Sequence, residues 1–174
     1  MSAPDIREIL PASGIENENA LAALLIETVA AGGSVSFMHP LSEADATAFW
    51  RDWLASAARG ERIVFGAFAD GALVGATTLV LACPPNQPHR AEIAKMMTAR
   101  AFRGRGVATA LMRAAEAAAR ARGRWLLTLD TAAEDGAAGF YEKLGFVRAG
   151  EIPDYALKPH GGLTSALLYW KRLA

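Results

Sequence analysis

The strongest constraint on the fold is a β-hairpin pattern in the stretch "RIVFGAFADGALVGATTLVLA". Two β-rich runs meet there at Asp70-Gly71, a dipeptide that favours a two-residue turn. Two amphipathic helical patterns precede this hairpin, and strand and helix patterns alternate after it. We therefore predict the element order β-α-α-β-β-β-α-β-α-β-β. This order makes the chain an α/β (α+β) protein with a mixed sheet and helices on its faces.

The two helical patterns before the hairpin have apolar residues at helical spacing. The first, "IENENALAALLIETVAA", ends at Gly32-Gly33, and the second begins at Ser42, where Asp45 completes a weak capping box. The apolar stripe of the second helix consists of Phe49, Trp50, Trp53 and Leu54. This stripe is either core packing or one wall of a substrate pocket.

Length and composition predict one globular domain, residues 1–174. Of the 174 residues, 52% are apolar and 21% are charged, and a chain of this size can bury a core without disulfides or metals. The single cysteine, Cys83, can form no internal disulfide, which favours a reducing compartment. The start "MSAPDIREIL" lacks the layout of a signal peptide, and there is no run of about 18 apolar residues to span a bilayer. We expect a cytoplasmic protein that binds no membrane.

The formal net charge is zero, but the charges are unevenly distributed. Between Arg100 and Arg124 there are seven arginines and one acidic residue, Glu116. Overall neutrality argues against general nucleic-acid binding, whereas the local excess would steer an anionic ligand to one place. A solvated helix face explains several of these arginines. Arg103 and Arg105 stand beside glycines and fit a ligand site better.

The segment "AFRGRGVATALM" places these glycines and arginines before an alanine-rich helical run. Arginine at a helix N-terminus is unfavourable unless an anion compensates, and glycine lets the backbone approach a ligand closely. No P-loop string occurs. A dinucleotide fingerprint is half present, with Thr109 in place of its third glycine and Asp130 as the candidate ribose-binding acid. The string "RGRGVA" at 103–108 fits the acyl-CoA pyrophosphate motif Q/R-x-x-G-x-G/A throughout.

This motif resembles that of the GNAT superfamily of acyl-CoA N-acyltransferases, and the string "AAGFYEKLGF" resembles a second family signature. The resemblance extends from about Arg62 to Leu173. Within the superfamily, "HRAEIAKMMT", "LLTLDT" and "IPDYALKPHGGLTSALLYWK" are similar to the tabtoxin-resistance type of acetyltransferase. The resemblance implies a mostly antiparallel central sheet of about six to seven strands, helices on both faces, and acetyl-CoA as cosubstrate without a metal. Glu134 departs from the asparagine of many members, so we assign it no cofactor contact.

The resemblance also implies where the cofactor binds. Backbone N–H groups at the start of the helix can donate to the pyrophosphate, and arginines can add charge-assisted hydrogen bonds. The pantetheine arm would pair along the strand that ends in "KMMT", where a backbone N–H would polarise the thioester carbonyl. The side chains of Met96 and Met97 are expected in the core. The predicted cofactor-binding residues are Met97, Thr98, Arg103, Gly104, Arg105, Gly106, Val107, Ala108, Thr109 and Tyr141.

Acetyl transfer to an amine requires that the ammonium lose a proton and that the leaving thiolate gain one. The resemblance implies that Tyr141 is the general acid near the sulfur; the alternative is a core aromatic residue. Glu92 and Asp130 are the candidate carboxylates that bind a cationic amine or relay its proton through water. Structural roles remain open for both: Asp130 as a cap of the next turn, and Glu92 as an ion-pair partner of Arg90 or Lys95.

Three functions remain open at this level. The first is a small-molecule N-acetyltransferase that works by direct transfer in a ternary complex. Its acceptor would be an amino-acid-like toxin, an aminoglycoside or a polyamine, with protein amines as an alternative. The second is a non-catalytic acyl-CoA sensor or interaction domain, and the third a nicotinamide-dinucleotide enzyme.

Other features of the sequence lead to further expectations. His39, His89 and His160 share no metal-ligand spacing, so we predict no metal site. A turn-rich loop, "PDYALKPHGG", is expected to overhang the substrate with Asp154, Tyr155 and His160. Apolar residues in the last strand would suit a homodimer.

Overall fold

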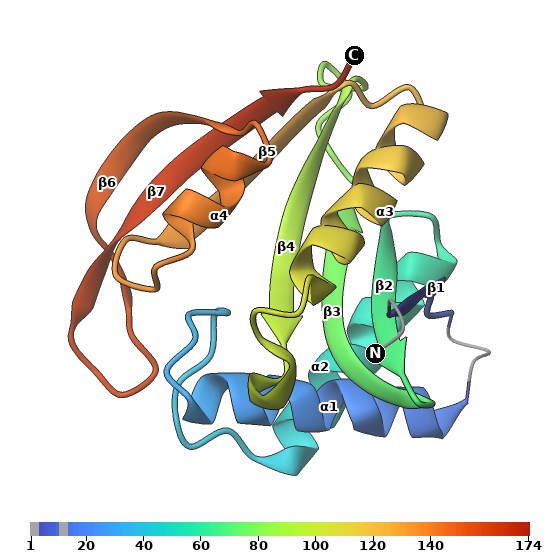
Figure 1. The fold of residues 1–174 in the computed structure, drawn as a ribbon, viewed down its shortest axis with the longest axis vertical. Coiled ribbons are helices and arrows are strands. Elements are labelled where there is room, and N and C mark those ends of the chain that lie inside the picture. Colours follow the sequence, from blue (N-terminus) through green and yellow to red (C-terminus); the bar gives the residue numbers. More distant parts are fainter. Residues whose placement is uncertain (1–3, 11–13) are drawn as a thin grey trace.

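The computed structural model describes residues 4–10 and 14–174 and arranges them around one sheet (Figure 1). Residues 1–3, which belong to the N-terminal stretch considered for a signal peptide, lie outside this range. The helices and strands are β1 (Asp5–Glu8), α1 (Ile15–Ala30), α2 (Glu43–Ala58), β2 (Arg62–Ala69), β3 (Ala72–Val80), β4 (Arg90–Thr98), α3 (Val107–Ala121), β5 (Leu126–Ala132), α4 (Ala138–Lys143), β6 (Val147–Leu157) and β7 (Leu163–Arg172), with a 3-10 turn at Arg100–Phe102. This order is the predicted one.

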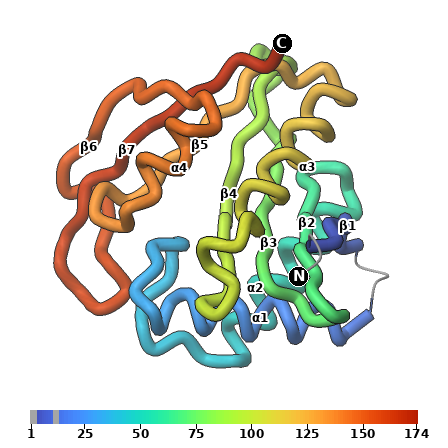
Figure 2. Tube along the Cα trace, in the orientation of Figure 1, coloured from blue at the N-terminus to red at the C-terminus, as the bar shows by residue number. Residues whose placement is uncertain are grey.

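The sheet of the described residues has seven strands in the order β1-β2-β3-β4-β5-β7-β6. Neighbouring strands are antiparallel, except that β4 and β5 are parallel. The prediction of a mixed, mostly antiparallel sheet is therefore confirmed. In Figure 2 the hairpin of β6 and β7 lies on the side of the molecule away from β1.

Helices cover both faces of the sheet, as predicted. Helices α1 and α2 pack with Val64, Ala76 and Met97 in one apolar cluster. Helices α3 and α4 pack with the opposite strand faces, including Ile63 and Ile93, in a second cluster. Alternate residues of a strand point to opposite faces, which explains why one strand serves both clusters. None of the helices in the described part of the chain is both long and apolar enough to cross a bilayer.

Two local features position the elements around the site. Asp70 and Gly71 both have positive φ, 49° and 82°, which confirms the predicted two-residue turn between β2 and β3. Gly75 on β3 lies under the first turn of α3: a Cβ there would be 2.7 Å from Cγ1 of Val107 and 3.0 Å from the carbonyl oxygen of Met97. The absence of a side chain at Gly75 therefore lets α3 begin close to β3 and β4.

The segment 153–162 differs from the predicted loop. Strand β6 continues to Leu157, and the turn of the hairpin occupies residues 158–162. The register of β6 against β7 shifts between Ile152 and Ala156, and Asp154 has φ 52°. Pro153 has no N–H to donate, and this bulge accommodates it within the strand. The expectation of a loop was wrong for residues 153–157, because pairing with β7 resumes at Ala156 and Leu157 after the bulge.

Candidate active site

A cavity of about 1270 Å³ opens where β4 and β5 separate. The two strands pair only from Arg90 and Leu126 to Glu92 and Thr128, and beyond these residues they diverge. The cavity is lined by β4, the end of β5, the start of α3, α4 and the connection between α1 and α2. Crevices beyond the carboxyl ends of adjacent parallel strands are common ligand sites.

The loop before α3 forms one end of the cavity. Gly104 and Gly106 line it with φ angles of 73° and 81°, and a Cβ at either position would meet no protein atom within 4 Å. Glycine is therefore favoured here by the backbone conformation, and the space beside it is open. Gly106 is the N-cap of α3, whose first turn has no acidic residue and no side-chain cap. The first N–H groups of α3 are thus suited to bind an anion.

The two arginines of this loop differ in position. Arg103 lines the cavity, as do Val107, Ala108 and Thr109. Arg105 is exposed and is not a cavity-lining residue; its guanidinium carbon lies 5.3 Å from the centre of the Phe102 ring. Of the two predicted anion-binding arginines, the structure places Arg103 at the cavity.

Strand β4 contributes Met97 and Thr98 to the lining. The side chain of Met97 is buried in the cluster with α1 and α2, and that of Met96 packs against the opposite cluster. Both methionine side chains therefore pack where predicted. A bulge precedes them: the pairing register with β3 shifts, and Lys95 has φ 54°. Such bulges redirect side chains next to ligand sites.

Tyr141 lies on α4, is 6% exposed and lines the cavity. The rings of Phe140 and Phe146 contact it edge-on, at centroid distances of 5.1 and 6.0 Å. Burial raises the pKa of Tyr141 to about 12, and the nearby charges of Asp130 and Asp135 add to this increase. The phenol therefore stays protonated at neutral pH. Tyr141 is at once a core aromatic residue and part of the cavity wall, where its phenol is protonated.

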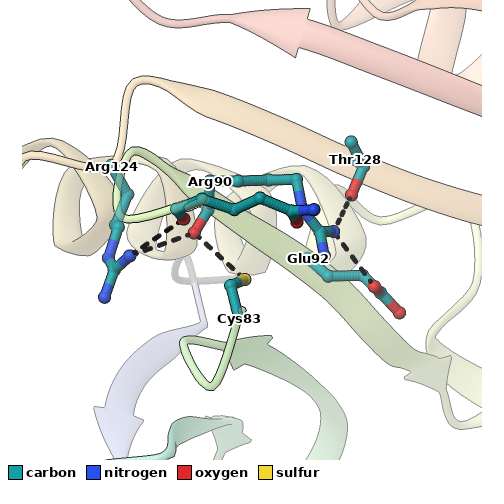
Figure 3. A network of polar contacts seen from close by, with 6 residues as sticks. Cys83, Arg90, Glu92, Arg124 and Thr128 are labelled. Atoms are coloured by element: carbon teal, nitrogen blue, oxygen red, sulfur yellow. Dashed lines mark hydrogen bonds and ion pairs between the residues drawn. The ribbon is translucent and has the colours of Figure 1, made fainter. Parts of the chain in front are cut away.

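The two predicted carboxylates also line the cavity. Glu92 is 41% exposed and accepts a hydrogen bond from Nη1 of Arg90 at 3.4 Å; the same guanidinium donates to Oγ1 of Thr128 at 2.9 Å (Figure 3). Glu92 is thus paired with Arg90, one of the two alternatives considered for it. Asp130 is exposed, and its charge raises the pKa of both Tyr141 and Lys95. Neither carboxylate is buried.

A family model described as the acetyltransferase (GNAT) family matches residues 27–146. The chain belongs to the GNAT family. Its cosubstrate is acetyl-CoA, and the uncapped start of α3 and the open space beside Gly104 and Gly106 fit the pyrophosphate of this molecule. The predicted resemblance and the predicted cosubstrate are confirmed.

Solved acetyltransferase structures show the same fold. An N-acetyltransferase from Staphylococcus aureus Mu50 is 21% identical with a TM-score of 0.83, covering 99% of this chain and 100% of that chain. A ribosomal-protein-alanine N-acetyltransferase from Brucella melitensis is 22% identical, with a TM-score of 0.82 and coverage of 97% and 99%. A phosphinothricin acetyltransferase from Sinorhizobium meliloti in complex with AcCoA is 18% identical, with a TM-score of 0.80 and coverage of 99% and 90%. At these identities the likeness establishes the fold.

The sequence did not indicate that Lys95 is part of this acetyltransferase's cavity. Its ammonium donates to the carbonyl oxygen of Val35 and to Oγ of Ser36, both at 2.8 Å. The centres of three aromatic rings lie within 6 Å of it: Phe37, Phe49 and Trp53. Burial lowers the pKa of Lys95, while the charges of Asp130 and Glu92 oppose this effect. The signal available in the sequence was Lys95 itself, a lysine within the largely apolar segment "AEIAKMMT".

Arg62, at the start of β2, is the second unexpected residue. Its guanidinium carbon lies 3.6 Å from the centre of the Trp53 ring, and its Nε donates to Oγ of Ser56 at 2.8 Å. Its Nη1 is buried and has no hydrogen-bond partner among the described residues, an arrangement that costs about 1–3 kcal/mol. Burial also lowers the pKa of Arg62.

The aromatic stripe of α2 is divided between the two predicted roles. Trp50 is fully buried in the core, whereas Trp53 lines the cavity and donates from Nε1 to Oγ1 of Thr78 at 3.0 Å. One tryptophan therefore stabilises α2 on the sheet, and the other forms a wall of the site.

The rim of the cavity joins segments distant in sequence. The N–H of Ser34 donates to Asp135, and Lys158 of the hairpin turn donates to Glu134 at 2.8 Å. The His160 ring lies 4.6 Å from the His39 ring. The turn at 158–162 thus reaches the connection between α1 and α2. Among the described residues, no group of three His, Cys, Asp or Glu side chains is placed to bind a metal ion.

Proposed function

We propose that this GNAT acetyltransferase transfers the acetyl group of acetyl-CoA to a primary amine of a small molecule, by direct transfer in a ternary complex. The observation that carries the proposal is one cavity that joins the first turn of α3, the Tyr141 phenol and two carboxylates. We further propose that residues 1–174 act as one domain, since the sheet includes strands from β1 to β7. A cytoplasmic location fits the single cysteine.

In this proposal, cofactor binding depends mainly on the backbone. N–H groups of Gly104, Gly106 and the first turn of α3 donate to the pyrophosphate, and Arg103 adds a charge-assisted hydrogen bond. Arg105 is a weaker candidate because its side chain lies over Phe102. A backbone N–H near Met97 and Thr98 polarises the thioester carbonyl. Val107, Ala108 and Thr109 complete the seat for the cofactor.

Three side chains are proposed to handle protons. Tyr141, kept protonated by burial, donates to the leaving thiolate. Glu92 and Asp130 orient the ammonium of the acceptor and accept its proton through water. The exposure of both carboxylates fits this relay, because a water molecule can reach them. These proposed roles require that Tyr141, Glu92 and Asp130 contact substrate or solvent inside the cavity, and all three line it.

The lining of the cavity favours a small acceptor. The connection between α1 and α2, together with Trp53 and Lys95, lines the part of the cavity that we assign to the acceptor, its acceptor end. The similar structures include one acetyltransferase for phosphinothricin and one for a ribosomal-protein alanine, so both acceptor classes occur on this fold. Membership of the GNAT family argues against the third hypothesis, a nicotinamide-dinucleotide enzyme.

A thiol-release assay tests the proposal. Purified protein and acetyl-CoA are incubated with a broad library of small amines and with peptides that have free N-termini, while calorimetry measures acetyl-CoA binding. Release of CoA with a small amine, and none with peptides, is the expected result. Acetyl-CoA binding without release by any amine would instead identify a non-catalytic sensor, and release with peptides alone would identify a protein acetyltransferase.

We also propose that the enzyme forms a homodimer through its C-terminal hairpin. Strand β6 is an edge of the sheet, and large apolar side chains of β6 and β7 are exposed: Val147, Ile152, Tyr155, Leu157, Leu163 and Trp170. An edge strand with apolar side chains readily pairs with another chain. Light scattering on the eluted protein should give twice the 18.4 kDa chain mass; a monomer at high concentration would refute the proposal.

A further inference from the structure

The acceptor end of the cavity contains two cationic side chains that face the same indole ring. The Arg62 guanidinium stacks on Trp53 at 3.6 Å, and the Lys95 ammonium lies 5.9 Å from the centre of that ring. Both residues line the cavity, and they come from different strands, β2 and β4. A pocket that recognised an amine by carboxylates alone would not need these two charges. Their presence requires an explanation.

The sheet register places one of the cations, Arg62, in the same row as a carboxylate, Glu92. Arg62 pairs with Val80, Val80 pairs with Glu92, and Glu92 pairs with Thr128, so these residues form one row across four strands. Directly paired residues point to the same face of a sheet. With strands about 4.8 Å apart, the backbones of Arg62 and Glu92 are separated by roughly 10 Å. The cavity lining therefore presents the cation Arg62 and the carboxylate Glu92 on the same face of the sheet, two strands apart, with Lys95 on the same strand as Glu92.

Both cations have unused hydrogen-bonding capacity. Lys95 donates to Val35 and to Ser36, and an ammonium has three donors. Nη1 of Arg62 is buried without a partner among the described residues. Buried donors are rarely left in this state, and each exception calls for a reason. An oxygen anion supplied by a ligand would accept from the third donor of Lys95 and would compensate the charge of the Arg62 guanidinium.

The backbone supports the same interpretation. Lys95 and its hydrogen-bond partner Ser36 both have positive φ, 54° and 74°. Residues other than glycine adopt this conformation at a cost, and such residues concentrate at functional sites. Here this backbone conformation places the ammonium of Lys95 in the cavity wall, between the bulge of β4 and the connection between α1 and α2.

We propose that Arg62 and Lys95 bind an oxyanion of the acceptor, while Glu92 and Asp130 face its amine. The inference rests on the proposed small-molecule acetyltransferase function and narrows its substrate to a primary amine that also bears a carboxylate, phosphonate or sulfonate group. Free amino acids and their phosphonate analogues belong to this class. A polyamine or an aminoglycoside carries no anion for the two cations and would be repelled by them.

The test compares matched acceptors. Thiol release is measured with a panel of α-amino acids, their primary amides, aminophosphonates, aminosulfonates and polyamines. The wild-type enzyme is expected to prefer an acceptor with an oxyanion over its uncharged amide by about 10- to 100-fold in kcat/KM, because the amide leaves charged donors unpaired. The carboxylate, phosphonate and sulfonate arms identify which oxyanion is preferred.

Variants connect that preference to the two residues. Arg62→Met and Lys95→Met should reduce kcat/KM for the oxyanion acceptor about 10-fold more than for its amide. Arg62→Lys and Lys95→Arg, which keep the charge, should retain most of the preference and guard against a folding defect. Arg51→Gln is the matched control: it removes an exposed cation of α2 that pairs with Glu18 outside the cavity, and both acceptors should be unaffected.

The outcomes of these experiments distinguish a failure of this inference from a failure of the proposed acetyltransferase function. If the wild-type enzyme acetylates polyamines or uncharged amides as well as oxyanion acceptors, the inference fails and the proposed function stands. Equal losses for both acceptors in the methionine variants would also overturn it, because a lysine that merely fastens the α1–α2 connection would affect both alike. If acetyl-CoA binds and no amine releases CoA, the proposed function itself fails.

Discussion

The two ends of the cavity are constructed differently. The proposed cofactor end is nearly continuous in sequence: Thr98, Arg103, Gly104 and residues 106–109 follow one another from β4 into α3. The acceptor end combines Trp53 of α2, Arg62 of β2, Lys95 of β4, Asp130 of β5 and the connection between α1 and α2. A motif can describe the first end because the backbone groups proposed to bind the cofactor are close together in the chain. No motif describes the second, because its side chains converge from five elements.

The difference also has a chemical basis. Every acetyl-CoA presents the same pyrophosphate, so one uncapped helix start serves for all members of a family. Acceptors differ in charge and shape, so specificity depends on side chains that can vary without changing the fold. We therefore expect substitutions to separate cleanly: cofactor-end changes should alter acetyl-CoA affinity, and acceptor-end changes should alter acceptor kinetics.

The largest expected effect is at Tyr141, between the two ends. Tyr141→Phe removes the proton donor and should lower kcat about 100-fold or more, with acetyl-CoA affinity changed less than about twofold in calorimetry. Because burial raises the pKa of Tyr141 to about 12, its ionisation should not reduce the wild-type rate between pH 6 and about pH 10.

The matched control is Tyr169→Phe. Tyr169 is also buried, its ring centre is 6.1 Å from that of Tyr141, and its hydroxyl donates to Glu142 rather than lining the cavity. This variant should keep nearly full kcat. Similar kcat losses in the two variants would mean that packing, and not proton donation, explains the effect at Tyr141.

The carboxylates should give the next largest effect. Glu92→Gln and Asp130→Asn should each lower turnover about 10-fold or more, because the acceptor ammonium loses a proton acceptor. Acetyl-CoA affinity should remain nearly intact. Glu151→Gln, at an exposed ion pair on β6, serves as the control. Unchanged turnover in both variants would refute the roles of Glu92 and Asp130.

The cofactor end should respond to a backbone change. Gly106→Ala places a Cβ on a residue with φ 81°, at a cost of roughly 1–2 kcal/mol. We expect about 5-fold weaker acetyl-CoA binding and an unchanged KM for the acceptor. Gly123→Ala, at φ 68° beyond the other end of α3, should cost similar stability in thermal unfolding. The acetyl-CoA affinity of Gly123→Ala should not change. An equal loss of affinity in both variants would show that reduced helix stability explains the effect of Gly106→Ala.

The smallest effect should follow from loosening the acceptor end alone. Ser42 caps α2 by accepting a hydrogen bond from the N–H of Asp45 at 3.1 Å. Ser42→Ala should lower stability by about 1 kcal/mol, or the melting temperature by roughly 2–4 °C. Since α2 carries Trp53, the acceptor KM should rise about twofold while acetyl-CoA affinity stays constant. A change in cofactor affinity instead would mean that the two ends are coupled.

The fold was largely predictable because its signals are short-range. The hairpin turn at Asp70-Gly71, the cap at Ser42 and the order of strands and helices all depend on residues near one another in the chain. The hairpin of β6 and β7 was the exception. Its proline and glycines are typical of a loop, yet pairing with β7 carries the strand through a bulge as far as Leu157.

The sequence by itself determined the element order, the glycine-rich start of α3 and the tyrosine signature on α4, since each depends on local conformation or on a contiguous motif. The tertiary structure alone decided what the acceptor end contains. Ile93 packs against α3 before the bulge at Lys95, and Met97 packs against α1 and α2 after it. A single inserted residue reverses which side chains face which side of a sheet. That reversal, with the register that aligns Arg62 and Glu92, depends on strand pairing over long range.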